Sequence, residues 1–306
     1  MRKWLCLFFL LAHLHGVVFP IQFSIPEEKI VTRIPEKRRD FAQLIPGLGQ
    51  TYTYQTEESY YEGYRESYFG MTSRKAGWDC LRHYEILANG CIPYFPNLEE
   101  CNSETMTFLP KDLILEAMNL EGVSYMHIDH SRFNKTRYYE ILNALLDHTR
   151  KFLCSKAMGE YLLKKIGYSG KGKILFLSGH MMPDYQRCLT LIGLRQSLGE
   201  RLIDVPKIDH LYKSFANPEF LYGKGFTYSR ILDDISINRE RIEERILNHE
   251  FDLIIYGSVH RGLPFYPLVL SRYAPNEIIY ICGEDTHSCT YKDALQASPF
   301  FLRECE

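Results

Sequence analysis

The sequence contains few of the features that identify a protein at first sight. It has no C-x-x-C pair among its nine cysteines, no D-x-D motif, no internal repeat and no low-complexity segment. The missing cysteine pairs exclude the usual spacing of a structural zinc site. We interpret the cysteines mainly as small buried hydrophobic residues in a reducing setting, with one or two disulfides as the alternative. The net charge of −2 gives no indication of a nucleic-acid or anionic-membrane partner.

An apolar run opens the chain but is too short to span a bilayer comfortably. Arg2 and Lys3 precede the run from Trp4 to Ala12, which is the shape of a signal peptide. We therefore predict a leader over residues 1–18 and an exported or secretory protein, which conflicts with reduced cysteines. A signal anchor, which would associate the protein with a membrane, and a buried strand are the alternatives. Without an export signal the protein would be cytoplasmic.

The rest of the chain changes pattern at YSGKGK (168–173). Before this stretch, apolar spacing predicts helices at 111–119, 133–153 and 156–166, and short strands at 91–95 and 122–126. After it, strands at 174–178, 251–258 and 276–283 alternate with helices, which predicts a parallel α/β sheet. Because 306 residues are enough for two domains of ordinary size, we predict domains at 19–168 and 169–306.

Each of the three strands after the boundary ends in glycine followed by polar residues, in SGHMMPD, YGSVHRG and CGEDTH. Ligands of open parallel sheets bind outside the carboxyl ends of the strands. We therefore predict that these loops converge on one rim of the sheet; the alternative is that they are solvated loops. The rim candidates are Gly179, His180, Asp184, His260, Arg261, Glu284 and Asp285.

Tyrosine is abundant, with 22 residues, and several occur in TYTYQTEESYYEGYRESYF (51–69). Such a run is typical of a packed, tyrosine-rich surface. A platform for planar rings or sugar rings is the alternative interpretation.

The stretch GWDCLRHYEILANGCIPYFP (77–96) combines charge with an apolar end. It predicts a helix over Asp79–Asn89 that ends at Gly90. Helical spacing places four polar residues on one face of this helix. They are Asp79, Arg82, Glu85 and Asn89. This stripe is either a solvated face or part of a binding site.

Two cations, Arg74 and Lys75, precede the start of this helix. A helix N-terminus with nearby basic side chains is suited to a diphosphate. A carboxylate two turns further along, at Glu85, could accept hydrogen bonds from a ribose diol. Phosphate at one end and a diol at the other describe a nucleotide.

The same stretch resembles the donor half of exostosin-like glycosyltransferases of the GT-B class. The matching residues are Ser73, Gly77, Trp78, Asp79, Arg82, Glu85, Gly90, Cys91, Ile92 and Pro93. PDYQRC, LYGKGFTYS, FDLIIYGSVHR, CGEDTH and FFLRE resemble the other lobe of these proteins, and FPIQFSIPEEKI (19–30) resembles the segment that joins the lobes. The resemblance therefore covers nearly all of the chain after the leader.

The resemblance implies an α/β fold with two Rossmann-like lobes facing each other across a cleft. The lobe order is reversed relative to the family, so the chain resembles a circular permutation, which domains tolerate when their ends lie close together. In this reading residues 19–168 bind a nucleotide-sugar donor and residues 169–306 form the acceptor lobe.

The implied activity is transfer of a sugar from a nucleotide sugar to a glycan or another hydroxyl acceptor, without a metal or cofactor. The donor-binding residues would be Arg74, Lys75, Asp79, Arg82, Glu85 and Gly90. An inverting reaction needs a base, for which Asp184, Asp285 and Glu284 are candidates; Gly179, His180, His260 and Arg261 would form the acceptor rim. The His127-x-Asp129-His130 motif could bind a metal, but a polar loop is the simpler interpretation.

Two other functions fit the same sequence. The first is a non-catalytic protein that keeps the fold and binds a nucleotide or glycan. The second is a structural or interaction protein. In such a protein the helix predicted over Asp79–Asn89, the motif helix, would pack against the rest of its lobe and bind no ligand. The charge density over residues 74–85 favours a ligand over the second of these.

Overall fold

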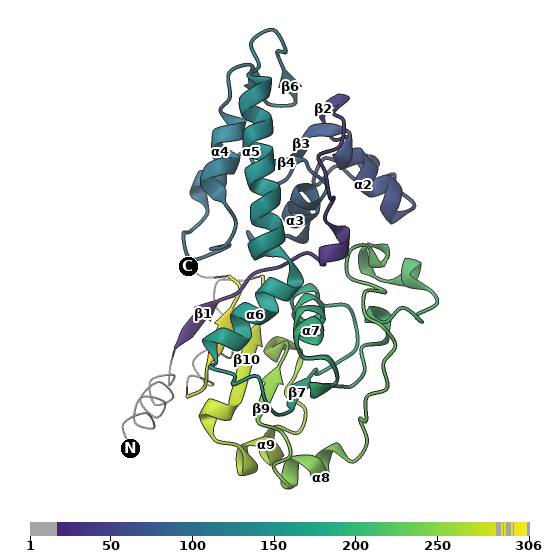
Figure 1. The fold of residues 1–306 in the computed structure, drawn as a ribbon, viewed down its shortest axis with the longest axis vertical. Helices are drawn as coiled ribbons and strands as arrows, with labels where there is room; N and C mark the ends of the chain where they lie inside the picture. Colours follow the sequence, from purple (N-terminus) through teal and green to yellow (C-terminus); the bar gives the residue numbers. More distant parts are fainter. Residues whose placement is uncertain (1–16, 286–288, 290, 292–294, 296, 305–306) are drawn as a thin grey trace.

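The computed structural model describes residues 17–285, 289, 291, 295 and 297–304. It is an α/β structure with two parallel sheets (Figure 1). The large sheet has six strands in the order β1-β11-β10-β9-β7-β8, and the small sheet has the order β2-β3-β4. The large-sheet strands are β1 (Val18–Pro20), β7 (Ile174–Leu177), β8 (Leu202–Val205), β9 (Leu253–Tyr256), β10 (Ile278–Cys282) and β11 (Phe300–Leu302). The prediction of a parallel α/β sheet is confirmed.

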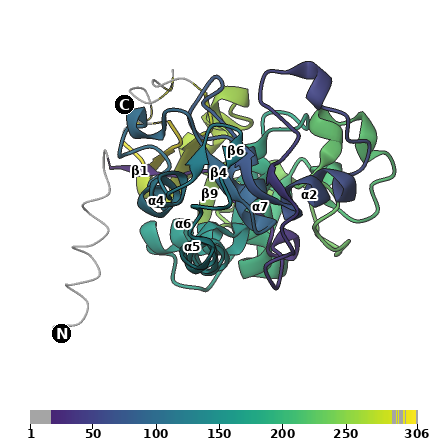
Figure 2. The same cartoon turned by 90° about the horizontal axis from the view of Figure 1, so that it is seen from above.

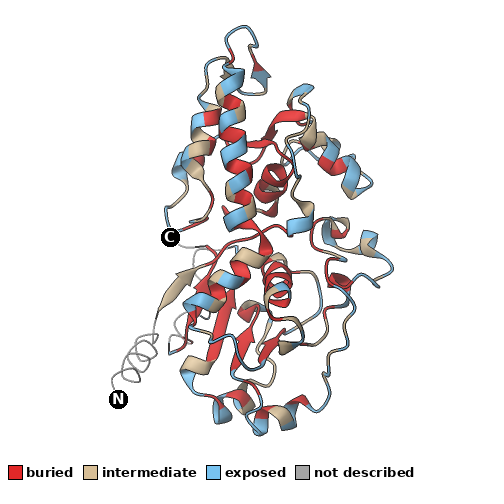
Figure 3. Ribbon diagram, in the orientation of Figure 1, coloured by how far each residue is buried: buried red, intermediate tan, exposed pale blue. Residues whose placement is uncertain are grey.

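The large-sheet region has helices on both faces, which explains why its strands are almost wholly apolar. Successive side chains of β7 alternate between two clusters of the core: Ile174 and Phe176 face one, Leu175 and Leu177 the other. Figure 3 shows these strands buried between the helices. The helices are α6 (Ser155–Lys165) and α7 (Tyr185–Leu198) on the first side, and α8 (Ile242–Leu247) and α9 (Tyr266–Arg272) on the second.

The small-sheet region contains the motif helix and the tyrosine-rich stretch. Its strands are β2 (Arg39–Phe41), β3 (Ser67–Met71) and β4 (Ile92–Tyr94), with a separate hairpin of β5 (Val123–Ser124) and β6 (His127–Ile128). Its helices are α2 (Glu57–Arg65), α3 (Leu81–Ala88), α4 (Lys111–Met118) and α5 (Lys135–His148). Three tyrosines of α2 are buried, namely Tyr60, Tyr61 and Tyr64, so the packed-surface interpretation holds for them.

The chain passes between the two regions in two adjacent segments. Ile25 N–H donates to Leu153 O at 3.0 Å, and Ser155 N–H donates to Ile25 O at 2.9 Å. Beyond this crossing, α6 packs on α7, and a Cβ at Gly193 would lie 1.8 Å from Ser155 O. The division at residue 168 stays a prediction about domains, but α6 and β1 lie with the large sheet and not with the small one.

Strand β1 pairs in parallel with β11, with Pro20 opposite Leu302. The predicted joining segment therefore lies beside FFLRE, and closeness of this kind is what a circular permutation requires. The permutation itself stays a prediction. The leader at 1–18 falls almost entirely outside the described residues. Within the described residues, no helix is both long and apolar enough to cross a bilayer.

Candidate functional site

The motif helix α3 (Leu81–Ala88) forms within the predicted range Asp79–Asn89, and Asp79 lies just before its N-cap. Cys80 is its N-cap, and Gly90 follows it with φ of +65°, the left-handed conformation that glycine adopts without cost. A Cβ at Gly90 would also lie 2.8 Å from Pro35 Cδ. Gly90 therefore has a structural reason to be glycine, and its role in donor binding stays a prediction.

The polar stripe of α3 is not a solvated face. The exposed fractions are 2% for Asp79, 7% for Glu85 and 0% for Asn89. Buried polar groups require partners, so the stripe is part of an internal network. Asn89 receives a hydrogen bond from Arg65 Nε at 3.0 Å.

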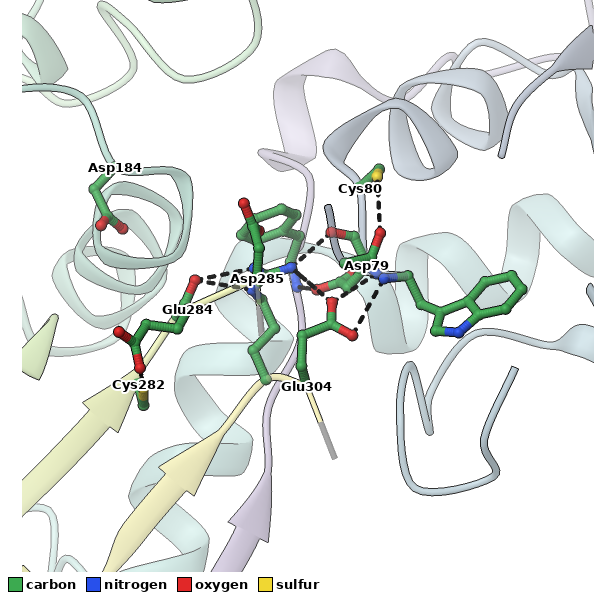
Figure 4. Close-up of polar contacts among 12 residues, drawn as sticks. Asp79, Cys80, Asp184, Cys282, Glu284, Asp285 and Glu304 are labelled. Atoms are coloured by element: carbon green, nitrogen blue, oxygen red, sulfur yellow. Dashed lines mark hydrogen bonds and ion pairs between the residues drawn. The ribbon is translucent and has the colours of Figure 1, made fainter. Parts of the chain in front are cut away.

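Asp79 contacts Arg303 and Glu304, which directly follow β11; Figure 4 shows Asp79 beside Glu304. Phe23 N–H and Tyr84 O–H donate to its carboxylate at 2.7 and 2.6 Å. The fully buried Arg303 lies 3.9 Å from it and donates to the Asp79 carbonyl at 2.7 Å. Burial outweighs these partners and raises the pKa of Asp79 to about 6.

Glu304 completes this network from the end of β11. Its carboxylate accepts from the backbone N–H of Trp78 at 3.2 Å and of Asp79 at 2.9 Å. A Cβ at Gly77 would lie 2.3 Å from Glu304 Oε1, so glycine is needed for this approach. Arg303 also donates to Asp285, which links the third rim loop to the motif helix.

Glu85 is bonded from both regions of the molecule. Tyr60 O–H donates to one carboxylate oxygen at 2.6 Å, and the hydroxyl of Thr227, from the large-sheet region, donates to the other. Burial raises the pKa of Glu85, although these two hydrogen bonds oppose the shift. Recognition of a ribose by Glu85 stays a prediction, and it would require the ligand to replace these partners.

The cations before α3 are exposed, in contrast to the stripe. The guanidinium of Arg74 lies 5.7 Å from the ring centroid of Trp78, and Lys75 Nζ donates to Tyr222 O–H at 3.3 Å. Lys75 therefore reaches the large-sheet region. Arg82 is less accessible, with one guanidinium nitrogen 3.1 Å from Tyr52 O–H.

The rim loops converge as their strand endings predict. His260 Nε2 and Arg261 Nε lie 3.3 and 3.1 Å from the same oxygen of Asp184. A Cβ at Gly179 would lie 2.0 Å from Arg261 O, so the first two loops touch. The third loop joins them at Gly283, where an added Cβ would lie 3.7 Å from His260.

Asp184 is the N-cap residue of α7. Its carboxylate accepts from Arg187 N–H at 3.1 Å and from Ser258 O–H at 2.9 Å, in addition to its contacts with His260 and Arg261. Burial raises the pKa of Asp184, but the hydrogen bonds from His260 and the Arg187 N–H outweigh it and hold the pKa well below its usual value. A carboxylate with so low a pKa is a poor general base.

His180 is held in one orientation by its own loop. Met182 N–H donates to its Nδ1 at 3.1 Å, which leaves Nε2 as the protonated nitrogen of the neutral ring. Burial, Arg187 and Arg261 lower its pKa and favour the neutral form. His180 can therefore donate a hydrogen bond at the rim.

The cysteines follow both interpretations of the sequence. Cys282 and Cys289 form a disulfide, and Cys282 Sγ also lies 3.6 Å from Glu284. Three of the free cysteines of the described chain are buried, namely Cys91, Cys154 and Cys188. The disulfide fits the alternative of one or two disulfides, since strand β10 and the following loop bring two cysteines together, and the buried free cysteines fit the main interpretation.

The possible metal motif has other partners. His130 Nε2 lies 2.7 Å from Asp40, and Asp129 accepts from Ser131 O–H at 2.6 Å. These contacts support the polar-loop interpretation. In the described part of the chain, the side chains that could hold a metal together are Cys282, Glu284 and Cys289, two of which form the disulfide.

No protein-family model, curated protein or solved structure matches this chain. The resemblance to exostosin-like glycosyltransferases therefore stays a prediction, and the function has to be argued from the site itself. Sequence reasoning did not assign a role to Arg303, Glu304 or Thr227, three buried residues of this site. The one local signal for Arg303 and Glu304 was that they form a charged pair directly after the apolar run Phe300–Leu302.

Proposed function

We propose that the protein is a glycosyltransferase that moves a sugar from a nucleotide-sugar donor to a glycan or another hydroxyl acceptor. One observation carries the proposal: the polar rim of a parallel sheet lies next to an exposed basic loop from the other sheet region. Asp285 O would lie 3.1 Å from a Cβ at Gly77, and Tyr222, which contacts Lys75, packs on Tyr185 with ring centroids 5.9 Å apart. Ligands of parallel sheets bind at this edge.

The donor diphosphate would lie against Arg74 and Lys75. Their charges would stabilise the negative charge that develops on the leaving diphosphate. The nearby start of α3 adds the positive end of a helix dipole. The acceptor hydroxyl would lie at the rim, where His180 and Arg261 can orient it.

The acceptor hydroxyl must lose a proton if the reaction inverts the anomeric centre. Asp184 is saturated with donors, so Asp285 and Glu284 are the remaining candidates for the base. The side chain of Asp285 is 57% exposed, although it also pairs with Arg303. We assign the base to Asp285 on this accessibility.

A non-catalytic binding protein is the second candidate, and a specific observation favours it. Both Asp184 and Glu85, the carboxylates predicted for chemistry and for ribose, are fully engaged with internal partners. Such a protein would bind the nucleotide without turnover.

One experiment separates the two candidates. The protein would be incubated with a panel of nucleotide sugars and glycan acceptors, and released nucleoside diphosphate would be measured together with equilibrium binding. A transferase releases nucleoside diphosphate in the presence of an acceptor, and Asp285→Asn lowers that rate at least 100-fold while retaining binding. Binding without release supports the second candidate, and neither binding nor release contradicts both.

A further inference from the structure

A segment of the large-sheet region, Tyr222–Ser229, lies against α2 of the small-sheet region. In Figure 2 this green segment is beside α2. Lys224 Nζ donates to Tyr54 O at 3.2 Å and to Gln55 Oε1 at 2.6 Å. The Phe226 ring stacks on Tyr60 with centroids 5.9 Å apart. The segment therefore bridges the two regions beside the proposed donor site.

The backbone of this segment is strained. Lys224 has φ of +57° and Thr227 has φ of +75°, and Gly223 and Gly225 are also left-handed. A positive φ is a genuine outlier for a β-branched residue such as threonine. Strain of this kind persists only where surrounding contacts impose it, and it is common at ligand clamps and switches.

The contacts that impose the conformation are made by the fully buried Thr227. Its hydroxyl donates to Glu85 and lies 2.7 Å from Tyr61 O–H, and its N–H donates to Glu57. Proteins hold a sugar or ribose through similar contacts. A carboxylate accepts a hydrogen bond from a hydroxyl of the ligand, and a tyrosine ring stacks on the ring of the ligand, as Tyr60 stacks on Phe226 here. The contacts of Thr227 and Phe226 thus have the chemistry of a bound polyol.

A second observation points to a ligand at the same place. Arg82 Nε is buried and has no hydrogen-bond partner among the described residues. Arg82 is on α3, one turn before Glu85, and its charge interacts favourably with Glu85. A buried donor left unsatisfied is costly, and an anionic or hydroxyl-bearing ligand that replaces Thr227 could satisfy it.

We propose that Tyr222–Ser229 is an internal ligand, which fills a polyol pocket formed by Glu57, Tyr60, Tyr61 and Glu85 and leaves it when a sugar-containing ligand binds. This inference rests on the proposed function for the identity of that ligand, the sugar or ribose of a nucleotide sugar. The closed segment holds down the apparent affinity, since only the fraction of molecules with an open pocket can bind.

Two substitutions at one position test the internal ligand. Thr227→Val keeps the shape and the β-branch but removes the hydroxyl from Glu85, so it opens the pocket. Thr227→Ser keeps the hydroxyl and removes the β-branch, so it relieves strain and holds the pocket closed. The affinity of both variants is measured for UDP-glucose, UDP-N-acetylglucosamine and GDP-mannose. We expect the nucleotide sugar that binds to have an affinity about ten times higher for Thr227→Val than for Thr227→Ser. Equal affinities, or weaker binding by Thr227→Val, would overturn the proposal while leaving the proposed function intact.

Hydrogen exchange of the ligand-free wild type tests the opening without any nucleotide. The N–H group of Thr227 donates to Glu57 of α2, so it is protected by the contact that the opening breaks. We expect this N–H group to exchange at least 100-fold faster than the amides of β7 and β9, because the segment opens without global unfolding. Exchange at the global rate would overturn the proposal. Fast exchange without binding of any nucleotide sugar would support an opening segment and contradict the proposed function.

Discussion

Two buried aspartates of this protein have opposite electrostatic surroundings. Asp79, just before the N-cap of α3, accepts hydrogen bonds from one backbone N–H and one tyrosine, with Arg303 at 3.9 Å. Asp184, at the rim, accepts from Arg187 N–H, Ser258 O–H and Arg261, and contacts His260. Burial dominates at Asp79 and raises its pKa, whereas the donors dominate at Asp184 and lower its pKa. The pKa of a buried carboxylate therefore depends on the number and charge of its close donors and not on burial alone.

The largest expected effect comes from removing the cation beside Asp79. Arg303→Ala leaves Asp79 and Glu304 buried without their positive partner, which costs about 3–5 kcal/mol of unfolding free energy. Urea denaturation measures this loss. The matched control is Arg261→Ala at the rim, where the side chain is 45% exposed and the expected loss is about 1 kcal/mol or less. Equal losses from the two substitutions would contradict the central role of Arg303.

The two aspartates should make stability depend on pH in opposite directions. The pKa of Asp79 is raised from 3.8 to about 6. Its contribution to the unfolding free energy is therefore fully present below pH 4 and is lost as pH rises through 6. The total loss is roughly 3 kcal/mol. The pKa of Asp184 is lowered, so its contribution is present above pH 4 and is lost as pH falls further.

The unfolding free energy of the wild type and Asp79→Asn, measured from pH 4 to 7, checks the sign. The difference between the two proteins should shift in favour of Asp79→Asn as pH rises. A constant difference would show that the pKa of Asp79 is not raised.

Neutral substitutions sharpen the same comparison at pH 7. Asp184→Asn removes the negative charge of the acceptor in these hydrogen bonds, so we expect a loss of about 1.5–3 kcal/mol. Asp79→Asn removes a carboxylate whose ionisation burial opposes, so we expect a change of roughly 1 kcal/mol or less. Thermal or urea unfolding of both variants measures the contrast. A larger loss from Asp79→Asn than from Asp184→Asn would reverse our ranking of the two sites.

Much of this arrangement could be predicted because it depends on local pattern. Short apolar runs ending in glycine marked β7, β9 and β10, and the rim residues converge because the carboxyl ends of parallel strands share one edge. Gly90 likewise marked the end of α3.

The burial of the motif stripe could not be predicted from the same pattern. Asp79 and Glu85 are internal because Arg303 and Thr227, 224 and 142 residues away along the chain, pack against them. Strand β1 (Val18–Pro20) spans the boundary between the expected leader and the joining segment. Strand β8 contains the buried Asp204, so it lacks the unbroken apolar run of β7 and β9. These features depend on tertiary contacts, which helical spacing and strand composition do not encode.

Titration calorimetry with nucleoside diphosphates tests the proposed donor site most directly. We expect the wild type to bind one of them, and the double substitution Arg74→Ala and Lys75→Ala to weaken it about 100-fold or more, since each charged phosphate contact contributes about 1.5–3 kcal/mol. The matched control, Lys164→Ala with Lys171→Ala, removes the same charge from exposed positions at the end of α6 and in the loop before β7, and should leave the affinity unchanged. Equal affinities for the two double variants, or no binding by the folded wild type, would contradict a nucleotide site at this edge of the sheet.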